Sequence, residues 1–429
     1  MTHSFSAKLL AVKRVIQNQG GKTPGVDGVV WNTPRKKMQA ALSLKRRGYK
    51  AKPLKRVYIP KKQIGKFRSL SIPVMRCRGQ QALHLLALEP VAEMLVDKNA
   101  YGFRPLRSTA DAIGQCFILL GRKDAAQYIL EADIKDCFNS ISKSWIQDNV
   151  TMDKEMLRKW LDAGYIDKGR WNPTEKGTPQ GSLCSPTILN VTLSGLEATV
   201  KKAASSRKYK VHSCIYADDF IITGATKEVL EDKVRPAVES FLRERGLSLS
   251  QEKTRVTHIN EGFDFLGMNI RKYKSKLIIK PAKSSIKRFL ADIRRIIKIN
   301  ATTKMEDLIR QLNPKVRGWA NYYRHVCSKR IFNYVDNAIF WALWRWCKRR
   351  HPKKGVRWIK DKYFHKDKLR NWVFSAKIQD KDGNKSYLNL IKAADTPIRR
   401  HVKIRAEVTP YNPIYREYLN ERLKGAMEN

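Results

Sequence analysis

The chain has 429 residues, 42% of them apolar, so it is long enough for two or three domains with hydrophobic cores. Its 86 Lys and Arg against 39 Asp and Glu leave a formal charge of +47, which predicts a polyanionic partner because a basic surface releases counterions condensed on phosphates. No apolar run is long enough to cross a bilayer, and the seven scattered cysteines form no CxxC pair, so membrane spans, a zinc site and a disulfide scaffold are not expected.

The N-terminal part of the chain is predicted to form helices around a basic β-hairpin. Apolar residues recur at helical spacing before Gly20-Gly21, and two strands rich in Lys and Arg are joined through Gly65. The predicted elements are an amphipathic helix over 7–17, a tight turn over 23–28, strands over 55–60 and 67–72, and a helix over 81–95.

A pair of acids stands in the central part, which runs from Tyr128 to about Gly267 as short strands separated by helices. Residues 211–223 predict a β-hairpin with Asp218 and Asp219 at its turn. Adjacent carboxylates between apolar strands repel each other unless a divalent cation neutralises them, and Mg²⁺ is the expected cation. The alternative is an ordinary solvated Asp-Asp turn.

A second apolar strand, over 128–133, ends at Asp133. Asp133 can complete a metal cage with the acidic pair, since nucleotidyl transfer uses two metals about 3.5–4 Å apart that carboxylates from neighbouring strands can bridge. Glu131 and Asp136 compete for this role. Strand alternation puts Glu131 on the same face as Asp133, whereas Asp136 lies beyond the strand end and is expected to face solvent.

Helices replace strands after Arg271. They are predicted from Ser284 to Arg349, and Arg and Lys share them with Trp and Tyr. This mixture suits stacking on bases combined with phosphate contact. The alternative, aromatic side chains that belong to the core, is expected for about half of them. From about Lys366 the chain is predicted to mix short strands and turns.

Seven short motifs follow one another along the chain. They are Tyr101-Gly102-Phe103-Arg104-Pro105, Gly177-Thr178-Pro179-Gln180-Gly181, Tyr216-Ala217-Asp218-Asp219 and the segments 25–28, 68–73, 247–254 and 265–267. In this order they resemble the reverse transcriptases encoded in bacterial and organellar group II introns. Residues 312–323 and 350–352 resemble the maturase domain that follows the polymerase in this family and grips the intron RNA.

The resemblance implies an α+β fold: a right-hand polymerase, with fingers and a palm whose antiparallel sheet bears the acidic hairpin, and then an α-helical thumb or maturase domain. The implied domains are fingers over 1–125, palm over 126–270, thumb and maturase over 271–365, and a DNA-binding-like segment over 366–429. The implied activity is RNA-directed DNA polymerisation with two Mg²⁺ ions, which Mn²⁺ can replace. The implied partners are intron RNA, an RNA template, a DNA primer, target DNA and deoxynucleoside triphosphates (dNTPs), in the bacterial cytoplasm, nucleoid-associated or ribonucleoprotein-bound.

Roles carried over from the family fall into three groups. The catalytic and metal-binding residues are Asp133, Asp218 and Asp219, with the backbone of Ile134 as a further metal ligand. The residues expected to bind the dNTP are Lys61, Arg68, Phe138, Gln180 and Lys253. The residues expected to contact template, primer or intron RNA are Tyr216, Gly181, Arg104, Arg317, Trp319, Tyr322, Tyr323 and Arg324.

Several of these roles compete with simpler ones. Lys61 and Arg68 match the fingers residues that clamp the triphosphate, or they are a solvated charge pair. Phe138 matches the residue that blocks a ribose 2′-hydroxyl, or it is a core aromatic. Lys253 matches a lysine near the triphosphate, and its role as a proton donor to pyrophosphate competes with that of a surface lysine.

The chain departs from the family pattern at Cys77, where Asp is usual, and at Ser182, where Gly is usual. The N-terminal extension before Thr23 is short. Residues 395–404 resemble the linker to an HNH nuclease, and the chain ends at Asn429, so we expect no bottom-strand cleavage and priming from a nick or a replication fork. The alternatives to an intron polymerase are a non-catalytic splicing factor and a reverse transcriptase recruited to DNA repair or phage defence.

Overall fold

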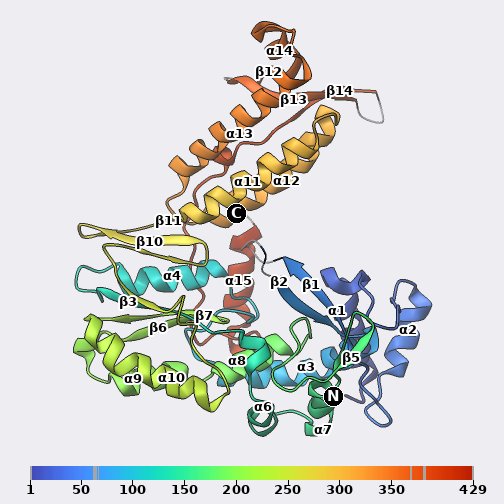
Figure 1. The fold of residues 1–429 in the computed structure, drawn as a ribbon, viewed down its shortest axis with the longest axis vertical. Coiled ribbons are helices and arrows are strands. Elements are labelled where there is room, and N and C mark those ends of the chain that lie inside the picture. Colours follow the sequence, from blue (N-terminus) through green and yellow to red (C-terminus); the bar gives the residue numbers. More distant parts are fainter. Residues whose placement is uncertain (1, 61–64, 66, 368–369, 380–382, 428–429) are drawn as a thin grey trace. The chain divides into compact units, whose positions relative to one another are not determined.

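Antiparallel strand pairs carry the acidic motifs, and helices pack around them (Figure 1). The computed structural model describes residues 2–60, 65, 67–367, 370–379 and 383–427. The chain divides into two units by its contacts. The first unit comprises Met1–Leu120, Asp124–Thr257 and Lys403–Asn429, and the second comprises Gly121–Lys123 and His258–Val402.

Some helices of the first unit begin at residues whose side chains cap them. The hydroxyl of Ser4 accepts a hydrogen bond from the Ala7 N–H, and Thr33 does the same for Lys36 ahead of Pro34. The helices are α1 (Phe5–Gln17), α2 (Pro34–Ser43), α3 (Met75–Leu95), α4 (Thr109–Leu120), α5 (Cys137–Ser140), α6 (Lys143–Asn149), α7 (Lys154–Leu161), α8 (Ser185–Leu193), α9 (Leu196–Ala203), α10 (Arg235–Glu244) and α15 (Arg416–Met427), with the shorter η1 (Gln19–Lys22), η2 (Arg207–Tyr209), η3 (Val229–Val234) and η5 (Pro413–Tyr415).

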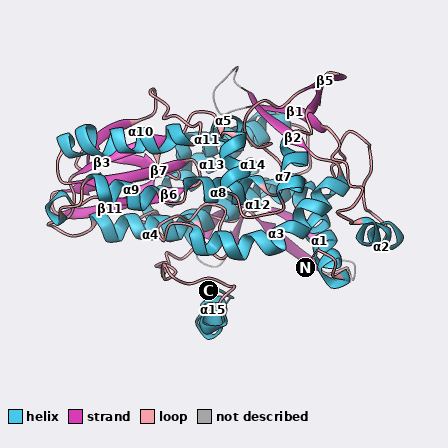
Figure 2. Cartoon of the chain, turned by 90° about the horizontal axis from the view of Figure 1, so that it is seen from below, coloured by secondary structure: helices cyan, strands magenta, loops and turns pink. Residues whose placement is uncertain are grey.

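Two four-stranded sheets belong to this unit. One has the order β2-β1-β4-β5, and the other, which carries the acids, has the order β6-β7-β3-β8 and lies among helices such as α9 and α10 (Figure 2). The strands are β1 (Leu54–Pro60), β2 (Phe67–Ile72), β3 (Tyr128–Asp133), β4 (Tyr165–Asp167), β5 (Arg170–Asn172), β6 (His212–Tyr216), β7 (Asp219–Gly224) and β8 (Arg255–His258). Apolar side chains of β3, β6 and β7 alternate into a core with α8, α9 and α10.

The predicted elements of this unit are confirmed with small shifts. The basic hairpin is confirmed, and its strands pair antiparallel with Lys55 opposite Ile72 through Pro60 opposite Phe67. The helix expected over 81–95 begins earlier, at Met75, because residues ahead of the apolar repeat are also buried there.

The C-terminal segment returns to the first unit. The side chain of Asp111 is fully buried and accepts hydrogen bonds from the Ile404 N–H at 2.8 Å and from the Arg422 guanidinium at 2.9 Å. The Arg107 guanidinium donates to the carbonyls of Ala406 and Val408. The sequence predicted one segment over 366–429, but the structure divides it, since residues up to Val402 belong to the second unit.

The second unit contains three long helices and two three-stranded sheets. The helices are α11 (Lys283–Ile299), α12 (Met305–Tyr323), α13 (Lys329–Arg350), α14 (Val356–Tyr363) and the short η4 (Ala393–Asp395). The strands are β9 (Phe263–Phe265), β10 (Met268–Tyr273), β11 (Lys276–Pro281), β12 (Phe364–Asp367), β13 (Arg370–Gln379) and β14 (Lys385–Asn389). The predicted helical region and the mixed segment after it are confirmed. No helix in the described part of the chain is both long and apolar enough to cross a bilayer.

Candidate active site

The three predicted catalytic acids meet at one end of the sheet β6-β7-β3-β8. Asp133, the last residue of β3, is paired in register with Asp219, the first residue of β7. Asp218 lies in the tight turn between Tyr216 and Asp219, where Ala217 adopts a positive φ of 57°. Strand pairing therefore brings together acids that are 86 positions apart in sequence.

Backbone hydrogen bonds fix the end of β3. The Ile134 N–H donates to the Asp218 carbonyl at 3.2 Å, and the Ser250 N–H donates to the Asp133 carbonyl at 2.8 Å. The turn that bears Asp218 and the segment around Ser250 are thus both hydrogen-bonded to the end of β3, at Ile134 and Asp133 respectively. Ile134 is buried, and the role of its carbonyl as a metal ligand remains a prediction.

The structure separates Asp133 from its two competitors. The Glu131 carboxylate is occupied by the Arg255 guanidinium at 2.9 Å and by the Thr257 hydroxyl at 2.6 Å. Asp136 is exposed beyond the strand, in a left-handed conformation before α5. The strand register places Asp133 beside the pair, opposite Asp219, whereas Glu131 stands opposite Ile221. Sequence reasoning missed Arg255, whose link to Glu131 spans 124 positions.

Burial and electrostatic repulsion raise the pKa values of both acids of the pair. Burial, followed by the charges of Asp133 and Asp218, raises the pKa of Asp219 to about 7. Burial and the Asp133 charge also raise the pKa of Asp218, while Arg68 and Lys253 oppose that rise. Buried carboxylates that repel one another gain stability when a cation binds between them. The site is thus suited to hold positive charge.

This shift predicts a specific pH dependence of stability. Between about pH 4 and pH 7 the folded protein keeps a proton on Asp219 that the unfolded chain has lost, so raising the pH through this window favours unfolding. In metal-free buffer the Asp219→Asn protein should therefore gain stability relative to wild type over this window, by up to about 4 kcal/mol, and gain no more above it. Melting curves at successive pH values in chelator measure the difference, and a constant difference would contradict the prediction.

Two of the three predicted basic contacts to the dNTP lie beside the acids. The Lys253 ammonium binds the Asp133 carboxylate at 2.7 Å, and this hydrogen bond raises the pKa of Lys253. Arg68 on β2 is exposed and close enough to Asp218 to lower its pKa. Lys61 lies outside the described residues. Arg68 and Lys253 therefore place positive charge beside the acidic pair, as a site for a triphosphate and its metal requires.

Phe138 is half-buried at α5 and lies edge-on to Phe103, with ring centroids 6.2 Å apart. Phe103 is exposed and has a positive φ of 58°. The neighbouring Gly102 packs so closely on the acidic turn that a Cβ there would overlap the backbone nitrogen of Ala217. The sequence predicted no role for Phe103, although this residue lies within the motif over 101–105.

The Gln180-Gly181 turn lies against the end of β2. The Gln180 carbonyl accepts a hydrogen bond from the Ser71 N–H at 2.7 Å. Gly181 has a φ of +113°, and a Cβ at this position would stand 2.9 Å from the Ser71 carbonyl oxygen. The glycine is therefore required by close backbone approach. Contacts of this turn with a dNTP or a template remain predictions.

The expectation that Arg104 binds nucleic acid is corrected by its burial. Its guanidinium forms two hydrogen bonds of 2.9 Å with the Glu93 carboxylate and donates to the carbonyls of Asp97 and Ala100. Only 3% of the side chain is exposed, so it cannot reach a phosphate. Arg104 holds the loop before α4 to α3.

Adjacent tyrosines at the end of α12 have different surroundings. Tyr323 is buried and donates its hydroxyl to the Gly267 carbonyl, so its predicted contact with RNA is also corrected. Tyr322 is 38% exposed and donates to the Leu266 carbonyl at 2.9 Å. Its contact with RNA remains a prediction.

Trp319 packs inside the second unit, stacked on Phe289 with centroids 4.7 Å apart. It is half-buried, which fits the alternative of a core aromatic. The remaining predicted nucleic-acid contacts are Arg317, which is exposed, and Arg324 and Tyr216, which are half-buried.

The two departures from the family pattern have different surroundings, and a side-chain contact is seen for Cys77. Cys77 is buried and accepts a hydrogen bond from the Tyr49 hydroxyl, which in turn accepts one from the Trp160 indole. The Ser182 N–H donates to the Pro179 carbonyl within the turn. Cys77 thus takes part in a buried polar chain between α3 and α7.

Comparison with known families identifies the class. Residues 59–270 match the reverse transcriptase (RNA-dependent DNA polymerase) family, and residues 1–44 match the N-terminal domain of reverse transcriptase. The chain is therefore a reverse transcriptase, an RNA-directed DNA polymerase, and its α+β fold is that of a right-hand polymerase with a helical domain. Residues 286–364 match the maturase-specific domain of group II introns. The chain belongs to the group II intron reverse transcriptases and maturases.

Two relatives and one solved structure are similar to this chain. Protein YkfC of Escherichia coli is 29% identical, covering 62% of this chain and 80% of that protein. Group II intron-encoded protein LtrA of Lactococcus lactis is 25% identical, covering 82% of this chain and 75% of that protein. A solved structure of telomerase from Candida albicans with a fragment of telomeric RNA has 13% identity and a TM-score of 0.41, covering 72% of this chain and 64% of that one.

Proposed function

We propose that Asp133, Asp218 and Asp219 are the catalytic acids with which this polymerase extends a DNA primer on an RNA template. The observation that carries the proposal is the pairing of Asp133 with Asp219 beside Asp218, where burial and repulsion raise two carboxylate pKa values. An arrangement that is unfavourable without a cation and faces two basic side chains is what nucleotidyl transfer requires.

The donor set fits Mg²⁺ in its chemistry. The three carboxylates, with the carbonyl of Ile134, would hold the metal, since Mg²⁺ prefers oxygen ligands. When bound, two such ions activate the primer 3′-hydroxyl and stabilise the leaving pyrophosphate. Among the described residues no three acidic, His or Cys side chains already form a metal cage. Asp133 pairs with Lys253 through one carboxylate oxygen, so the ammonium and a metal would share this carboxylate.

The remaining residues of the site bind and orient the dNTP. Arg68 and Lys253 supply positive charge for the triphosphate, and Lys61 is proposed to join them. Phe138 is proposed to close the sugar side of the pocket, supported by its contact with Phe103. The Gln180-Gly181 turn is proposed to lie along the templating base pair.

The polymerase and the maturase serve one intron in this proposal. The maturase-specific domain supports binding of intron RNA to the second unit. Template, primer, target DNA and dNTPs are the proposed partners of the first unit. Primer extension by the purified chain on an RNA template, with Mg²⁺ and then with excess chelator, tests the polymerase. If no metal-dependent product forms, the polymerase proposal is overturned, and the alternative that stands is a non-catalytic splicing factor.

Replacement of Phe138 by Ala tests the sugar gate. Removing the ring opens space at a ribose 2′-hydroxyl, so ribonucleotide incorporation relative to deoxynucleotide incorporation should rise by about 10–100-fold, the effect of about 1–3 kcal/mol of steric discrimination. Single-nucleotide extension kinetics with dCTP and CTP measure the ratio.

The matched control is Phe117→Ala, which removes an aromatic ring that is 47% exposed on α4. This protein should keep the wild-type ratio. If Phe138→Ala extends primers but keeps the wild-type sugar preference, Phe138 is a packing residue and not a gate.

A further inference from the structure

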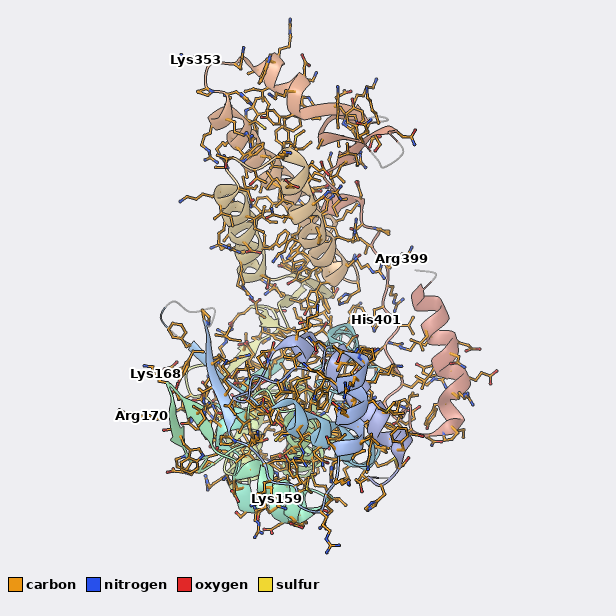
Figure 3. The ribbon with its side chains drawn as sticks, turned by 90° about the vertical axis from the view of Figure 1, so that its right-hand side faces the viewer. Lys159, Lys168, Arg170, Lys353, Arg399 and His401 are labelled. Atoms are coloured by element: carbon orange, nitrogen blue, oxygen red, sulfur yellow. The ribbon has the colours of Figure 1, made fainter. Side chains whose placement is uncertain are left out.

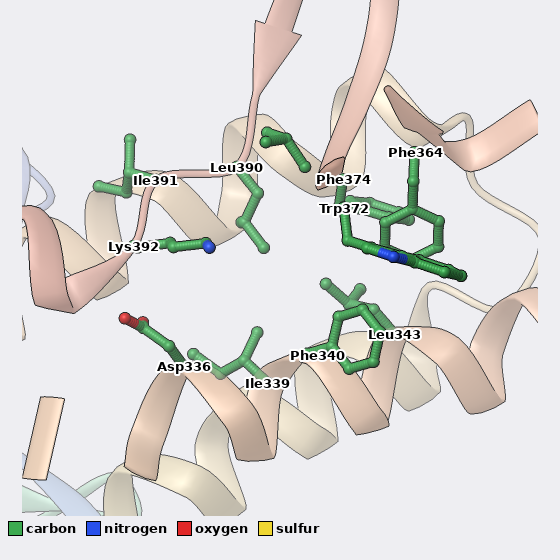
Figure 4. A pocket seen from close by; sticks show the side chains of 11 residues that line it. Asp336, Ile339, Phe340, Leu343, Phe364, Trp372, Phe374, Leu390, Ile391 and Lys392 are labelled. Carbon is green, nitrogen blue, oxygen red and sulfur yellow. The ribbon is translucent and has the colours of Figure 1, made fainter. Parts of the chain in front are cut away.

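An aromatic cleft opens in the second unit between α13 and the chain from β13 to η4 (Figure 4). About 420 Å³ of space lies among its lining side chains, a volume that includes open solvent. One side is aromatic and the other end is charged. The side chains that the argument uses are Phe340, Phe364, Trp372, Ile391, Asp336 and Lys392.

The aromatic side has a fixed geometry. The Trp372 indole is packed edge-to-face against Phe364, with centroids 5.6 Å apart, and against Phe340 and Trp344 at 6.1 and 5.8 Å. Phe364 and Trp344 are buried, whereas Trp372 remains 39% exposed. The neighbouring rings hold the indole in place, and its exposed part offers a preformed surface for stacking beside the Lys360 ammonium, which lies over the ring.

The charged end is formed by Asp336 and Lys392 (Figure 4). Both oxygens of Asp336 accept hydrogen bonds from the N–H groups of Ala393 and Ala394, at 2.8 and 2.9 Å. These bonds fix the carboxyl and leave each oxygen a second lone pair. A carboxylate and an ammonium side by side offer an acceptor and a donor, which match the edge of a nucleobase.

The surroundings of the cleft suit a phosphate backbone. Residues 341–360 hold eight Lys and Arg and no Asp or Glu, and Lys353 stands at one end of the unit (Figure 3). The Lys360 ammonium lies 5.2 Å from the Trp372 ring centroid, and the Lys348 ammonium lies 6.0 Å from that of Trp344. An apolar peptide or a small apolar ligand would gain nothing from these cations, whereas an RNA strand would.

We propose that this cleft binds one unpaired nucleobase of RNA, stacked on Trp372 with its polar edge toward Asp336 and Lys392 and its phosphates on Lys360 and Lys348. Unpaired bases of loops and bulges are the elements of RNA that proteins read by stacking and edge contacts. The proposal rests on the proposed binding of intron RNA by this unit, and it adds the site at which a base is captured.

Ultraviolet crosslinking of the full chain to a 20-nucleotide unpaired RNA of mixed sequence, followed by peptide mapping, tests the site. The crosslink is expected on Trp372. Ile391→Trp fills the cleft and keeps Trp372, so it should lower the yield at Trp372 by at least about 5-fold, the value of about 1 kcal/mol of stacking. Trp341→Ala removes a neighbouring tryptophan that is 48% exposed and outside the cleft, and it should leave the yield unchanged.

Affinity for the same RNA and for an abasic chain of equal length gives a second readout. Trp372→Ala should weaken binding of the RNA but not of the abasic chain, and Trp372→Phe should restore much of the loss. RNA binding without a crosslink at Trp372, or an unchanged yield in Ile391→Trp, would overturn the cleft alone. Failure of the wild type to bind RNA at all would overturn the proposed function with it.

Discussion

Replacing Asp133 by Asn is expected to lower the rate of primer extension by about 10³-fold or more, since each factor of ten corresponds to about 1.4 kcal/mol and a metal ligand supplies several. The amide has the same shape and can still accept the hydrogen bond from Lys253. It lacks the charge that, paired with Asp219, would hold a divalent cation. Single-turnover extension on an RNA template with saturating dNTPs and Mg²⁺ measures the rate of nucleotide addition.

Asp136→Asn is the matched control. It makes the same chemical change three residues later, at an exposed position where the left-handed backbone suits Asn as well as Asp. We expect its rate to stay within about 2-fold of wild type, because water screens the charge of this exposed side chain. Equal losses in the two proteins, or an Asp133→Asn protein within tenfold of wild type, would remove Asp133 from the catalytic set.

The acidic site could be predicted from the sequence because its geometry follows from strand periodicity. An apolar run ending in Asp133 and a hairpin with Asp218 and Asp219 at its turn allow few arrangements, and antiparallel pairing in one sheet puts their ends together. The choice of Asp133 over Glu131 needed the structure. Glu131 lies on the same strand face as Asp133, and its charge is neutralised by Arg255, which is distant in the sequence.

Side chains whose role depends on distant partners could not be predicted. Arg104 stands in a motif among other basic residues, and nothing local shows that Glu93 would bury it. Tyr322 and Tyr323 are adjacent on a helix, where successive side chains are rotated by about 100° about the helix axis, and this rotation decides which of the two enters the core. The attachment of the C-terminal segment to Asp111 joins residues 293 positions apart and has no local signal.

Replacing Glu93 by Ala is expected to destabilise the first unit by about 3–5 kcal/mol, the cost of removing one partner of a buried ion pair. Only 4% of the Glu93 side chain is exposed. Its carboxylate binds the Arg104 guanidinium at 2.9 Å and lies 3.6 Å from Arg107, whose side chain is fully buried. Two guanidinium groups in the interior would therefore lose the carboxylate that they share. Native-state hydrogen exchange of the α3 and α4 amides measures this loss separately from the second unit.

The control is Glu155→Ala, which removes an acid of the same unit that pairs with Lys159 at 2.7 Å but is 45% exposed. Water screens this pair, so the change should cost no more than about 1 kcal/mol. Because Arg107 also holds the carbonyls of Ala406 and Val408, Glu93→Ala should increase exchange in the C-terminal segment as well as in α4. Protection that falls in α3 and α4 but stays at the wild-type level over residues 404–408 would show that this segment is held by Asp111 alone.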